Sequence, residues 1–474
     1  MPDWSPVNLD LEKPRYLAIA DAIASDIKKG RLAAGDRLPP QRKLAQRLGV
    51  DFTTAARGYV EAGKRGLVIS TVGRGTFVQA ENPALPLTAG LATSGLATAG
   101  LAGARRLDPA NLTMNLPPEP DDPELLERMR AGLVEIARDL SPLLRYQWFG
   151  GTQGDKDAAS SWLGRRALVP AQERIFISPG VHPALTGIFG TMARPGDAVL
   201  SDRMTYPGLR SIAAQMGLRL LGLPTDANGI EPSALAEACV KLRPKALYLN
   251  PTLHNPTGLT MPARRRDEIA IICRRYGLPI VEDDAYGFIP PHGPAPFAAI
   301  APDITWHVAG LSKCIGAGLR VAYVIAPSAK AGWPFAAAMR AANVMASPLT
   351  VALATRWIQD GTADSILRFI RRETIARQEL AAHILTTKTE PPEPLSFCLW
   401  LRMPEGWTRS AFLDHMRATG LGIVTSDAFT IEGEPPEAAR LCLGGPISRR
   451  QLEHALEFMA HALGDAPSAA ASFL

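Results

Sequence analysis

Lys313 stands in an unusual setting for a lysine, within the stretch "GLSKCIGAGLR" of residues 310–320, where small residues surround it. A lysine is costly to place in a tight, apolar turn unless its amine has a chemical role. One such role is to form a Schiff base with an aldehyde cofactor. The setting of Lys313 therefore indicates a covalent cofactor site.

An anion site is predicted from the stretch "ISPGVHPAL" of residues 177–185, a strand followed by a glycine turn and a helix start with Pro183 in its first turn. A helix N-terminus offers free backbone amides and a positive dipole end to an anion such as a phosphate. Arg320 can add a guanidinium to the same phosphate.

Two further stretches supply groups for an aromatic ring. "IVEDDAYGF" ends an apolar strand with Asp283, a carboxylate that can keep a pyridine nitrogen protonated. Asn255, in the turn of "LNPTLHNPTG", and Tyr286 can hydrogen-bond a phenolic oxygen. Ligands of open α/β sheets bind at the carboxyl ends of strands, where all these residues fall. The combined set predicts a site for pyridoxal 5'-phosphate.

The elements that would position this site follow one another as strand, helix, strand. Apolar runs such as "RIFIS", "DAVLS", "ALYLN", "LPIVED", "ITWHVAG" and "LRVAYVIA" alternate with helical patterns. This order predicts an α/β domain with a mostly parallel sheet that is covered on both faces. Strands "SFCLWLRM" and "ARLCLGG" near the end predict a small C-terminal α+β lobe, about 365–465.

The first eighty residues predict a different kind of domain. Helical patterns over 15–30, 41–49 and 52–66 precede "LVISTVGRGTFV", two short β runs around a glycine turn. Asp51 is placed to cap the third helix. Helix, helix, turn, helix and β-wing is the layout of a winged helix-turn-helix.

Charge separates the two parts of the chain. Residues 1–80 contain 13 Lys and Arg against 8 Asp and Glu, which accounts for the whole net charge of +5. A basic excess in one small domain is expected where a protein contacts a phosphate backbone. Residues 81–109, rich in Pro, Ala, Gly and Thr, read as a flexible linker, with ends roughly 30 Å apart as a random coil.

Composition also bounds the compartment. The five cysteines are scattered without a CxxC pair, which argues against disulfides and structural zinc and fits a reducing cytoplasm. Residues 84–104 form a long uncharged stretch, but its Gly, Thr and Ser content makes it a poor membrane helix. The beginning of the chain lacks the pattern of a signal peptide. No membrane association and no metal site are predicted.

The four stretches, in this order and spacing, resemble the fold-type I PLP-dependent aminotransferases. With the winged helix, the chain resembles the MocR-type regulators of the GntR superfamily. The resemblance implies a DNA-binding domain over 13–80, the linker 81–109 and an aminotransferase-like effector domain over 110–465. It also implies a homodimer with its sites near the shared interface.

The resemblance also assigns roles to residues. Lys313 matches the Schiff-base lysine, Asp283 the partner of the pyridine nitrogen, and Arg440 the arginine that binds a substrate's α-carboxylate. Val181, His182, Ser312 and Arg320 match the phosphate site. The remaining matches are contacts of the cofactor ring, at Asn255 and Tyr286, a stacking aromatic, Tyr206, and a residue that relatives extend towards a neighbouring subunit's cofactor, Tyr146.

Two departures from the family pattern predict a weaker hold on the cofactor than in an enzyme. Gly310 stands where many relatives have a hydroxyl for the phosphate, and "GGTQGDKDAASSWL" lacks the Leu-Arg usual after its glycine. Asp284 competes with Asp283 for the pyridine partner. For the side chains of His182 and His254, and for Cys314, packing is the favoured interpretation.

On the DNA side, the third helix is expected to enter the major groove with its first turn. Thr53, Thr54 and Arg57 are predicted to face bases or phosphates there. Arg42 and Arg74, at the second helix and the wing tip, suit phosphates or the minor groove.

Three hypotheses of function remain open from the sequence. The first is a cytoplasmic transcription factor that binds an operator and responds to an amino compound at its PLP site. The second is an active aminotransferase with a DNA-binding appendage. In the third, the domain senses PLP itself. The effector (a B6 vitamer, GABA, taurine or another amine) and the sign of regulation are not encoded in any motif.

Overall fold

The structure is a computed structural model that describes residues 4–6, 14–33, 35–64, 67–71, 75–78, 112–148, 150–385, 393–418 and 421–464. These residues fall into two compact units, an N-terminal and a C-terminal one. The predicted linker, the apolar stretch 84–104 and Arg74 lie outside the described residues. Within the described ranges, no helix is both long enough and apolar enough to cross a bilayer.

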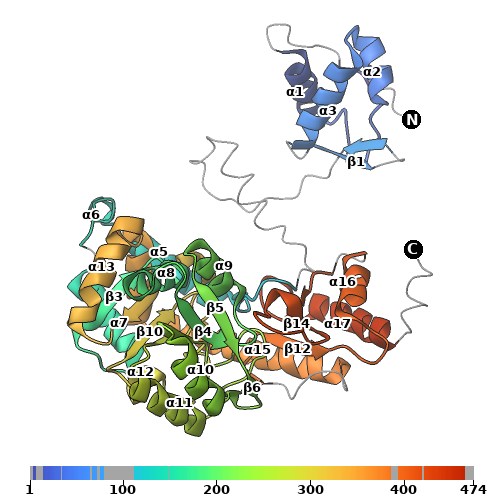
Figure 1. Cartoon of the computed structure of the whole chain (residues 1–474). Helices are drawn as coiled ribbons and strands as arrows, with labels where there is room; N and C mark the ends of the chain where they lie inside the picture. Colours follow the sequence, from blue (N-terminus) through green and yellow to red (C-terminus); the bar gives the residue numbers. More distant parts are fainter. Residues whose placement is uncertain are drawn as a thin grey trace. The chain divides into compact units, whose positions relative to one another are not determined.

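The N-terminal unit has the predicted winged-helix layout (Figure 1). Its first and third helices pack closely because position 58 is a glycine. A Cβ there would lie 2.8 Å from Cγ2 of Ile19. The Tyr59 hydroxyl donates to the Pro39 carbonyl at 2.8 Å, which ties the third helix to the preceding turn. The elements are α1 (Arg15–Lys28), α2 (Gln41–Leu48), α3 (Phe52–Lys64) and an antiparallel wing of β1 (Val68–Thr71) and β2 (Gly75–Val78).

The C-terminal unit is built on a seven-stranded sheet in the order β3-β11-β10-β9-β8-β4-β5. Its strands run parallel except β11, which is antiparallel to both neighbours. The prediction of a mostly parallel α/β sheet is confirmed. The strands are β3 (Ile175–Ser178), β4 (Ala198–Asp202), β5 (Arg219–Leu223), β8 (Ala246–Leu249), β9 (Ile280–Asp283), β10 (Thr305–Gly310) and β11 (Ala322–Ile325).

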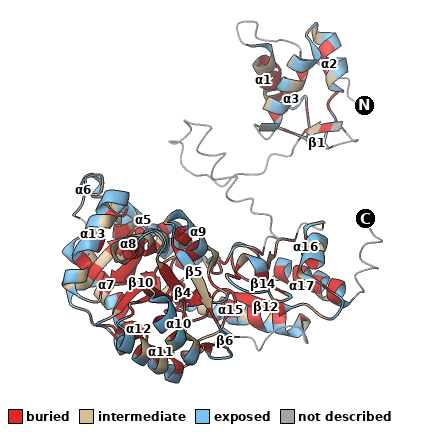
Figure 2. Ribbon diagram, in the orientation of Figure 1, coloured by how far each residue is buried: buried red, intermediate tan, exposed pale blue. Residues whose placement is uncertain are grey.

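Helices cover both faces of this sheet, and burial is concentrated in the strands between them (Figure 2). Alternate strand residues separate the two cores, so that Tyr248 and Val281 pack with one set of helices while Leu247 and Ile280 pack with the other. The first set is α8 (Val181–Met192), α9 (Pro207–Gln215) and α13 (Ala329–Asn343); the second is α10 (Pro232–Leu242), α11 (Ala263–Tyr276) and α12 (Phe297–Ile300).

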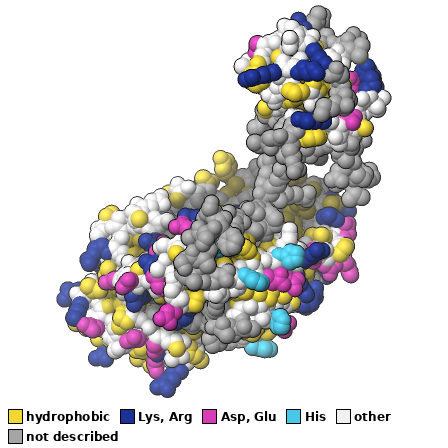
Figure 3. Space-filling view, turned by 90° about the vertical axis from the view of Figure 1, so that its right-hand side faces the viewer, with side chains coloured by type: hydrophobic (Ala, Val, Ile, Leu, Met, Phe, Trp, Pro, Cys, Tyr) yellow, Lys and Arg dark blue, Asp and Glu magenta, His cyan; other side chains and the backbone are white. Residues whose placement is uncertain are grey.

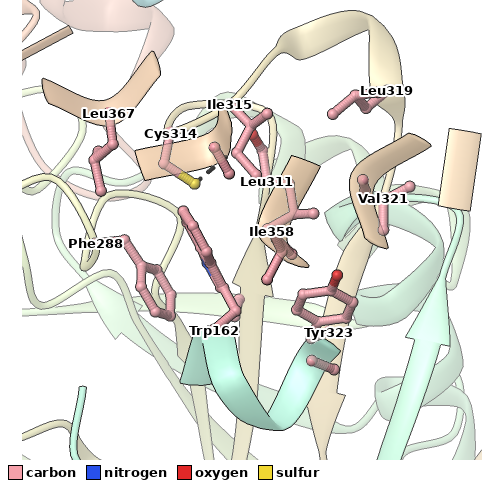
Figure 4. Packing of buried hydrophobic residues seen from close by; sticks show 14 of the residues in the cluster. Trp162, Phe288, Leu311, Cys314, Ile315, Leu319, Val321, Tyr323, Ile358 and Leu367 are labelled. Atoms are coloured by element: carbon pink, nitrogen blue, oxygen red, sulfur yellow. Dashed lines mark hydrogen bonds between the residues drawn. The ribbon is translucent and has the colours of Figure 1, made fainter. Parts of the chain in front are cut away.

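A third core lies at the β3–β11–β10 end of the sheet (Figure 4). Trp162 stacks on Phe288 with ring centroids 5.3 Å apart. Cys314 is fully buried in this cluster, and burial raises the pKa of its thiol to about 12. The structure therefore gives Cys314 a packing role. The helices around this core are α5 (Pro123–Ala137), α6 (Leu140–Leu143), α7 (Gln153–Gly164), α14 (Pro348–Gln359) and α15 (Thr362–Ile384).

The small lobe is a three-stranded sheet with helices on one face. Leu399, Leu401 and Leu441 pack against those helices, while Trp400 belongs to a separate cluster with Phe429. The two-stranded hairpin β6–β7 and the short strand β13 are not predicted from the sequence. The elements of the small lobe are β12 (Cys398–Arg402), α16 (Arg409–Ala418), β13 (Val424–Thr425), β14 (Ala438–Cys442) and α17 (Arg449–Gly464). The hairpin of β6 (Thr225–Asp226) and β7 (Gly229–Ile230) belongs to the large lobe, where Ile230 packs in the same core as α10 and α11.

Candidate functional site

Lys313 lies three residues beyond the end of β10, at the carboxyl edge of the sheet. Its Nζ donates a hydrogen bond to the main-chain carbonyl of Asn115. Burial lowers the pKa of the amine to about 8, because desolvation disfavours the charged form. An amine with this pKa has a far larger neutral fraction near physiological pH than an unperturbed lysine, and the neutral form is the nucleophile.

Asp283 is the last residue of β9 and is paired with Val308 of β10. Its Oδ2 accepts a hydrogen bond from the Tyr248 hydroxyl at 2.8 Å, while its buried Oδ1 has no partner among the described residues. Burial raises the pKa of the carboxyl to about 6, against the lowering effect of Tyr248. The neighbouring Asp284 is engaged with Arg166 at 3.3 Å.

Arg440, on β14 of the small lobe, reaches across to the large lobe. Its Nη1 donates to Asn255 Oδ1 at 2.6 Å and its Nη2 donates to the Thr113 carbonyl at 2.7 Å. The guanidinium lies over the Phe429 ring at 4.8 Å from the centroid. Its Nε is buried without a hydrogen-bond partner in the described part of the chain.

Tyr286 is joined to a segment that sequence reasoning missed. Its hydroxyl accepts from Asn115 Nδ2 at 2.9 Å, and the Oδ1 of Asn115 is left buried without a partner among described residues. Asn115 thus contacts Tyr286 with its side chain and Lys313 with its main chain. The stretch is held in place by Leu112, whose amide donates to the Gly422 carbonyl and whose carbonyl accepts from the Cys442 amide, both in the small lobe.

The predicted phosphate site assembles at the start of α8. Gly180 precedes the helix with φ of 101°, and a Cβ there would lie 2.9 Å from Nη2 of Arg320. The guanidinium therefore lies beside the first amides of α8, those of Val181 and His182. Ser312 is half-buried next to Lys313. The close approach of Val181 explains why a glycine occupies position 310, since a Cβ there would lie 2.7 Å from Val181 Cγ2.

Tyr206 extends this end of the site. Its hydroxyl forms a hydrogen bond with His182 Nε2, and the two rings meet edge to face with centroids 5.5 Å apart. Burial lowers the pKa of His182, and the Arg320 charge adds to this effect. His182 thus contacts a predicted site residue with its side chain, whereas His254 is buried and bonded to Thr257.

The loop that carries Tyr206 is joined to the small lobe. Met204 forms a β-bridge with Thr430, and the Thr205 amide donates to the Phe429 carbonyl at 2.9 Å. The Arg203 side chain donates to the carbonyls of Glu432 and Glu434 at 3.0 and 2.9 Å. These bonds connect the cofactor end of the large lobe with the segment after β13.

Tyr146 is not brought to this site within one chain. It is 86% exposed, and Trp148 two residues on is 81% exposed. A cavity of about 230 Å³ opens beside Trp148, lined by Leu143, Trp148, Met345 and Val351 among others. Exposed aromatic side chains beside an apolar cavity are a common feature of interaction surfaces.

The predicted DNA-facing residues gather around the start of α3. The hydroxyls of Thr53 and Thr54 both donate to the Asp51 carboxylate, which also accepts the Thr54 amide at 2.8 Å. Arg57 lies 4.3 Å above the Tyr16 ring. Arg42 lies 5.8 Å from the ring of Phe52, and Lys and Arg side chains are exposed on this unit (Figure 3).

The described residues fit pyridoxal 5'-phosphate. Asp283 Oδ1 suits a protonated ring nitrogen, Tyr286 and Asn255 suit a phenolic oxygen, and the start of α8 with Arg320 suits a phosphate. The orphaned atoms matter most here, because a buried polar atom without a partner is unfavourable until a ligand satisfies it.

Comparisons with known proteins agree with both units. The family "Aminotransferase class I and II" matches residues 108–459, and "Bacterial regulatory proteins, gntR family" matches residues 15–78. The HTH-type transcriptional regulator YdeF of Bacillus subtilis is 28% identical over 463 residues, covering 98% of this chain and 97% of that protein. The vitamin B6 salvage pathway transcriptional repressor PtsJ of Salmonella typhimurium is 26% identical over 317 residues, covering 66% of this chain and 67% of PtsJ.

Among solved structures, the C-terminal unit is similar to LysN, an α-aminoadipate aminotransferase from Thermus thermophilus crystallised with N-(5'-phosphopyridoxyl)-L-leucine. The TM-score is 0.68 at 22% identity, covering 78% of this chain and 95% of LysN. An archaeal kynurenine aminotransferase from Pyrococcus horikoshii gives the same TM-score at 21% identity, covering 78% of this chain and 94% of that one. These likenesses show the fold.

Proposed function

This chain belongs to the aminotransferase class I and II family, and because a GntR-type winged helix precedes that domain, we propose that it is a PLP-binding transcriptional regulator. The single observation that carries the proposal is the presence of a cofactor-fitting site and a basic winged helix in one chain. YdeF, whose similarity covers 98% of this chain, and PtsJ, whose similarity covers 66% of it, are named as transcriptional regulators.

The bound cofactor supplies an aldehyde that reacts with amines and a pyridine ring that withdraws electrons. Lys313 would be its covalent anchor, and Asp283 would hold the ring nitrogen. Arg440 would bind the carboxylate of an effector. The other contacts are the phenolic oxygen at Asn255 and Tyr286, the phosphate at Val181, His182, Ser312 and Arg320, and the ring face at Tyr206.

We assign residues 13–80 to DNA binding, 81–109 to a linker and 110–465 to effector binding. We also propose a cytoplasmic homodimer. The exposure of Tyr146 and Trp148 supports a second copy, because Trp148 lines a mostly apolar cavity and Tyr146 lies two residues before it. Such a dimer would present two winged helices to a two-half-site operator. Arg42, Thr53, Thr54, Arg57 and Arg74 would contact it.

Footprinting on the DNA upstream of the protein's own gene tests the regulator. We expect protection of two half-sites, with affinity that falls steeply as salt rises. Adding PLP, or PLP with an amino compound, should change that affinity in the wild type and leave Lys313→Ala unchanged. Absence of specific, salt-sensitive binding there and at neighbouring promoters would contradict the proposal. Repeated conversion of amino acids to oxo acids would instead favour an enzyme.

A further inference from the structure

Tyr248 lies beside the cofactor site and has no role in the proposed function so far. It is the third residue of β8, is fully buried, and is paired in register with Val281 of β9. Residues paired across parallel strands share a face, and alternate residues of one strand share a face as well. Tyr248 therefore lies on the same side of the sheet as Val281 and as Asp283, two residues further along β9. The hydroxyl reaches Asp283 Oδ2 at 2.8 Å.

A second residue of the same strand end fixes the backbone at Asp283. Asn250 Nδ2 donates to the Asp283 carbonyl at 2.7 Å, and Asn250 Oδ1 accepts the Asn255 amide at 2.9 Å. The end of β8 therefore holds both the main chain and one carboxylate oxygen of Asp283. Only Oδ1 remains without a partner among the described residues. These bonds fix the orientation of the Asp283 carboxylate and leave Oδ1 as its acceptor for a ligand.

We propose that Tyr248 is a positioning residue that keeps Asp283 ionised and turns its Oδ1 towards the ring nitrogen of the cofactor. This inference rests on the proposed PLP site. A neutral hydroxyl donating to a carboxylate stabilises the charged form. Without Tyr248, Asp283 would be a buried carboxylate that keeps only a backbone contact from Ala285, and a neutral, protonated acid would be favoured.

Burial and other titratable groups around Asp283 also influence the pKa of its carboxyl group. Burial is the largest influence and raises the pKa; the charge of Asp284 raises it further, and Lys313 lowers it. Burial raises the pKa of Tyr206 and Tyr286, and the charge of Asp283 adds to this effect in both. Among these neighbours, Tyr248 is the one whose side chain donates a hydrogen bond directly to Asp283.

The test compares the pH dependence of cofactor binding in the wild type and in Tyr248→Phe, measured by equilibrium dialysis. Asp283 must be ionised to pair with a protonated ring nitrogen, so wild-type affinity should fall as pH drops through about 6. Loss of a hydrogen bond to a charged group should move this fall upwards by about one pH unit. Tyr323→Phe, in a different core cluster, should leave the midpoint unchanged.

A cofactor analogue with CH in place of the ring nitrogen separates this effect from titration of the phosphate, which both compounds carry. The Tyr248→Phe shift should appear with PLP and be absent with the analogue. An unchanged midpoint, or an equal shift with both compounds, would overturn the role of Tyr248. Failure of wild-type protein to bind PLP at all would instead overturn the proposed cofactor site.

Discussion

At the residue scale, the site combines groups whose properties depend on burial. The apolar setting of Lys313 and the strand-end position of Asp283 were visible in the sequence, because motifs around both residues carry chemical meaning. Asn115 and Tyr248 were not. Asn115 contacts Lys313 through a main-chain carbonyl, which every residue has, and Tyr248 sits inside an apolar strand where an aromatic residue reads as core.

The lowered pKa of Lys313 predicts how fast the cofactor-free protein captures PLP. The amine is charged below pH 8 and neutral above it, so the capture rate should rise up to about pH 8 and then level off. Stopped-flow absorbance measures this rate. Free butylamine, with a pKa near that of an unperturbed lysine, about 10.4, is the control. A protein rate that keeps rising in parallel with butylamine would contradict the effect of burial.

At the element scale, the alternation of strand and helix patterns along the sequence explains why the fold was predictable. It also explains which elements could not be predicted. Strands with apolar runs on both faces, such as 246–249, are recognisable because parallel strands are buried on both sides. The two-residue strands β6, β7 and β13 carry too few residues for a periodic pattern. The segment around Asn115 is held by hydrogen bonds to the distant residues 422 and 442, which no local pattern records.

The buried contact between Arg166, two residues after α7, and Asp284, directly after β9, predicts a stability difference. Arg166→Ala leaves Asp284 buried without its ion-pair partner, which should lower the free energy of unfolding by about 3–5 kcal/mol. Arg274→Ala removes an exposed pair with Asp303 and should cost about 1 kcal/mol or less. Chemical denaturation of the cofactor-free protein measures both. Equal effects would contradict a special contribution of the buried pair.

The cap of α3 predicts a separable effect on DNA binding. Asp51→Ala removes the acceptor of the Thr54 amide, so the first turn of α3 should fray and operator affinity should fall. Asp51→Asn keeps an acceptor and should retain most of that affinity. Fluorescence anisotropy with labelled operator DNA measures both variants. Equal loss in the two variants would show that the charge of Asp51 matters and the cap does not.

At the scale of the whole molecule, each unit has a hydrophobic core of its own. Ile19, Ile23 and Tyr59 belong to the N-terminal core, while the C-terminal unit contains several larger clusters. The charge difference between the units was readable from the sequence. Arrangement of the two units was not, because residues 81–109 carry no periodic pattern that specifies a fold.

Separate cores predict separate melting. In calorimetry of the full chain, PLP should raise the melting temperature of the transition that belongs to the C-terminal unit, since a ligand stabilises the fold it binds. The transition of the N-terminal unit should stay in place. In Lys313→Ala the ligand-induced shift should be much smaller. A single transition that moves as a whole with PLP would contradict independent units.

The hydrogen bonds that join residues 203–205 to 429–434 couple two proposed functions within the C-terminal unit. Arg440 rests on Phe429, and the carbonyl of Phe429 holds the residue immediately before Tyr206. If Arg440 binds the carboxylate of an effector as proposed, its contact with Phe429 would link effector binding to the loop that carries Tyr206. Effector binding would then be expected to change the absorbance spectrum of the bound cofactor, because the two sites are joined through this stretch of main chain.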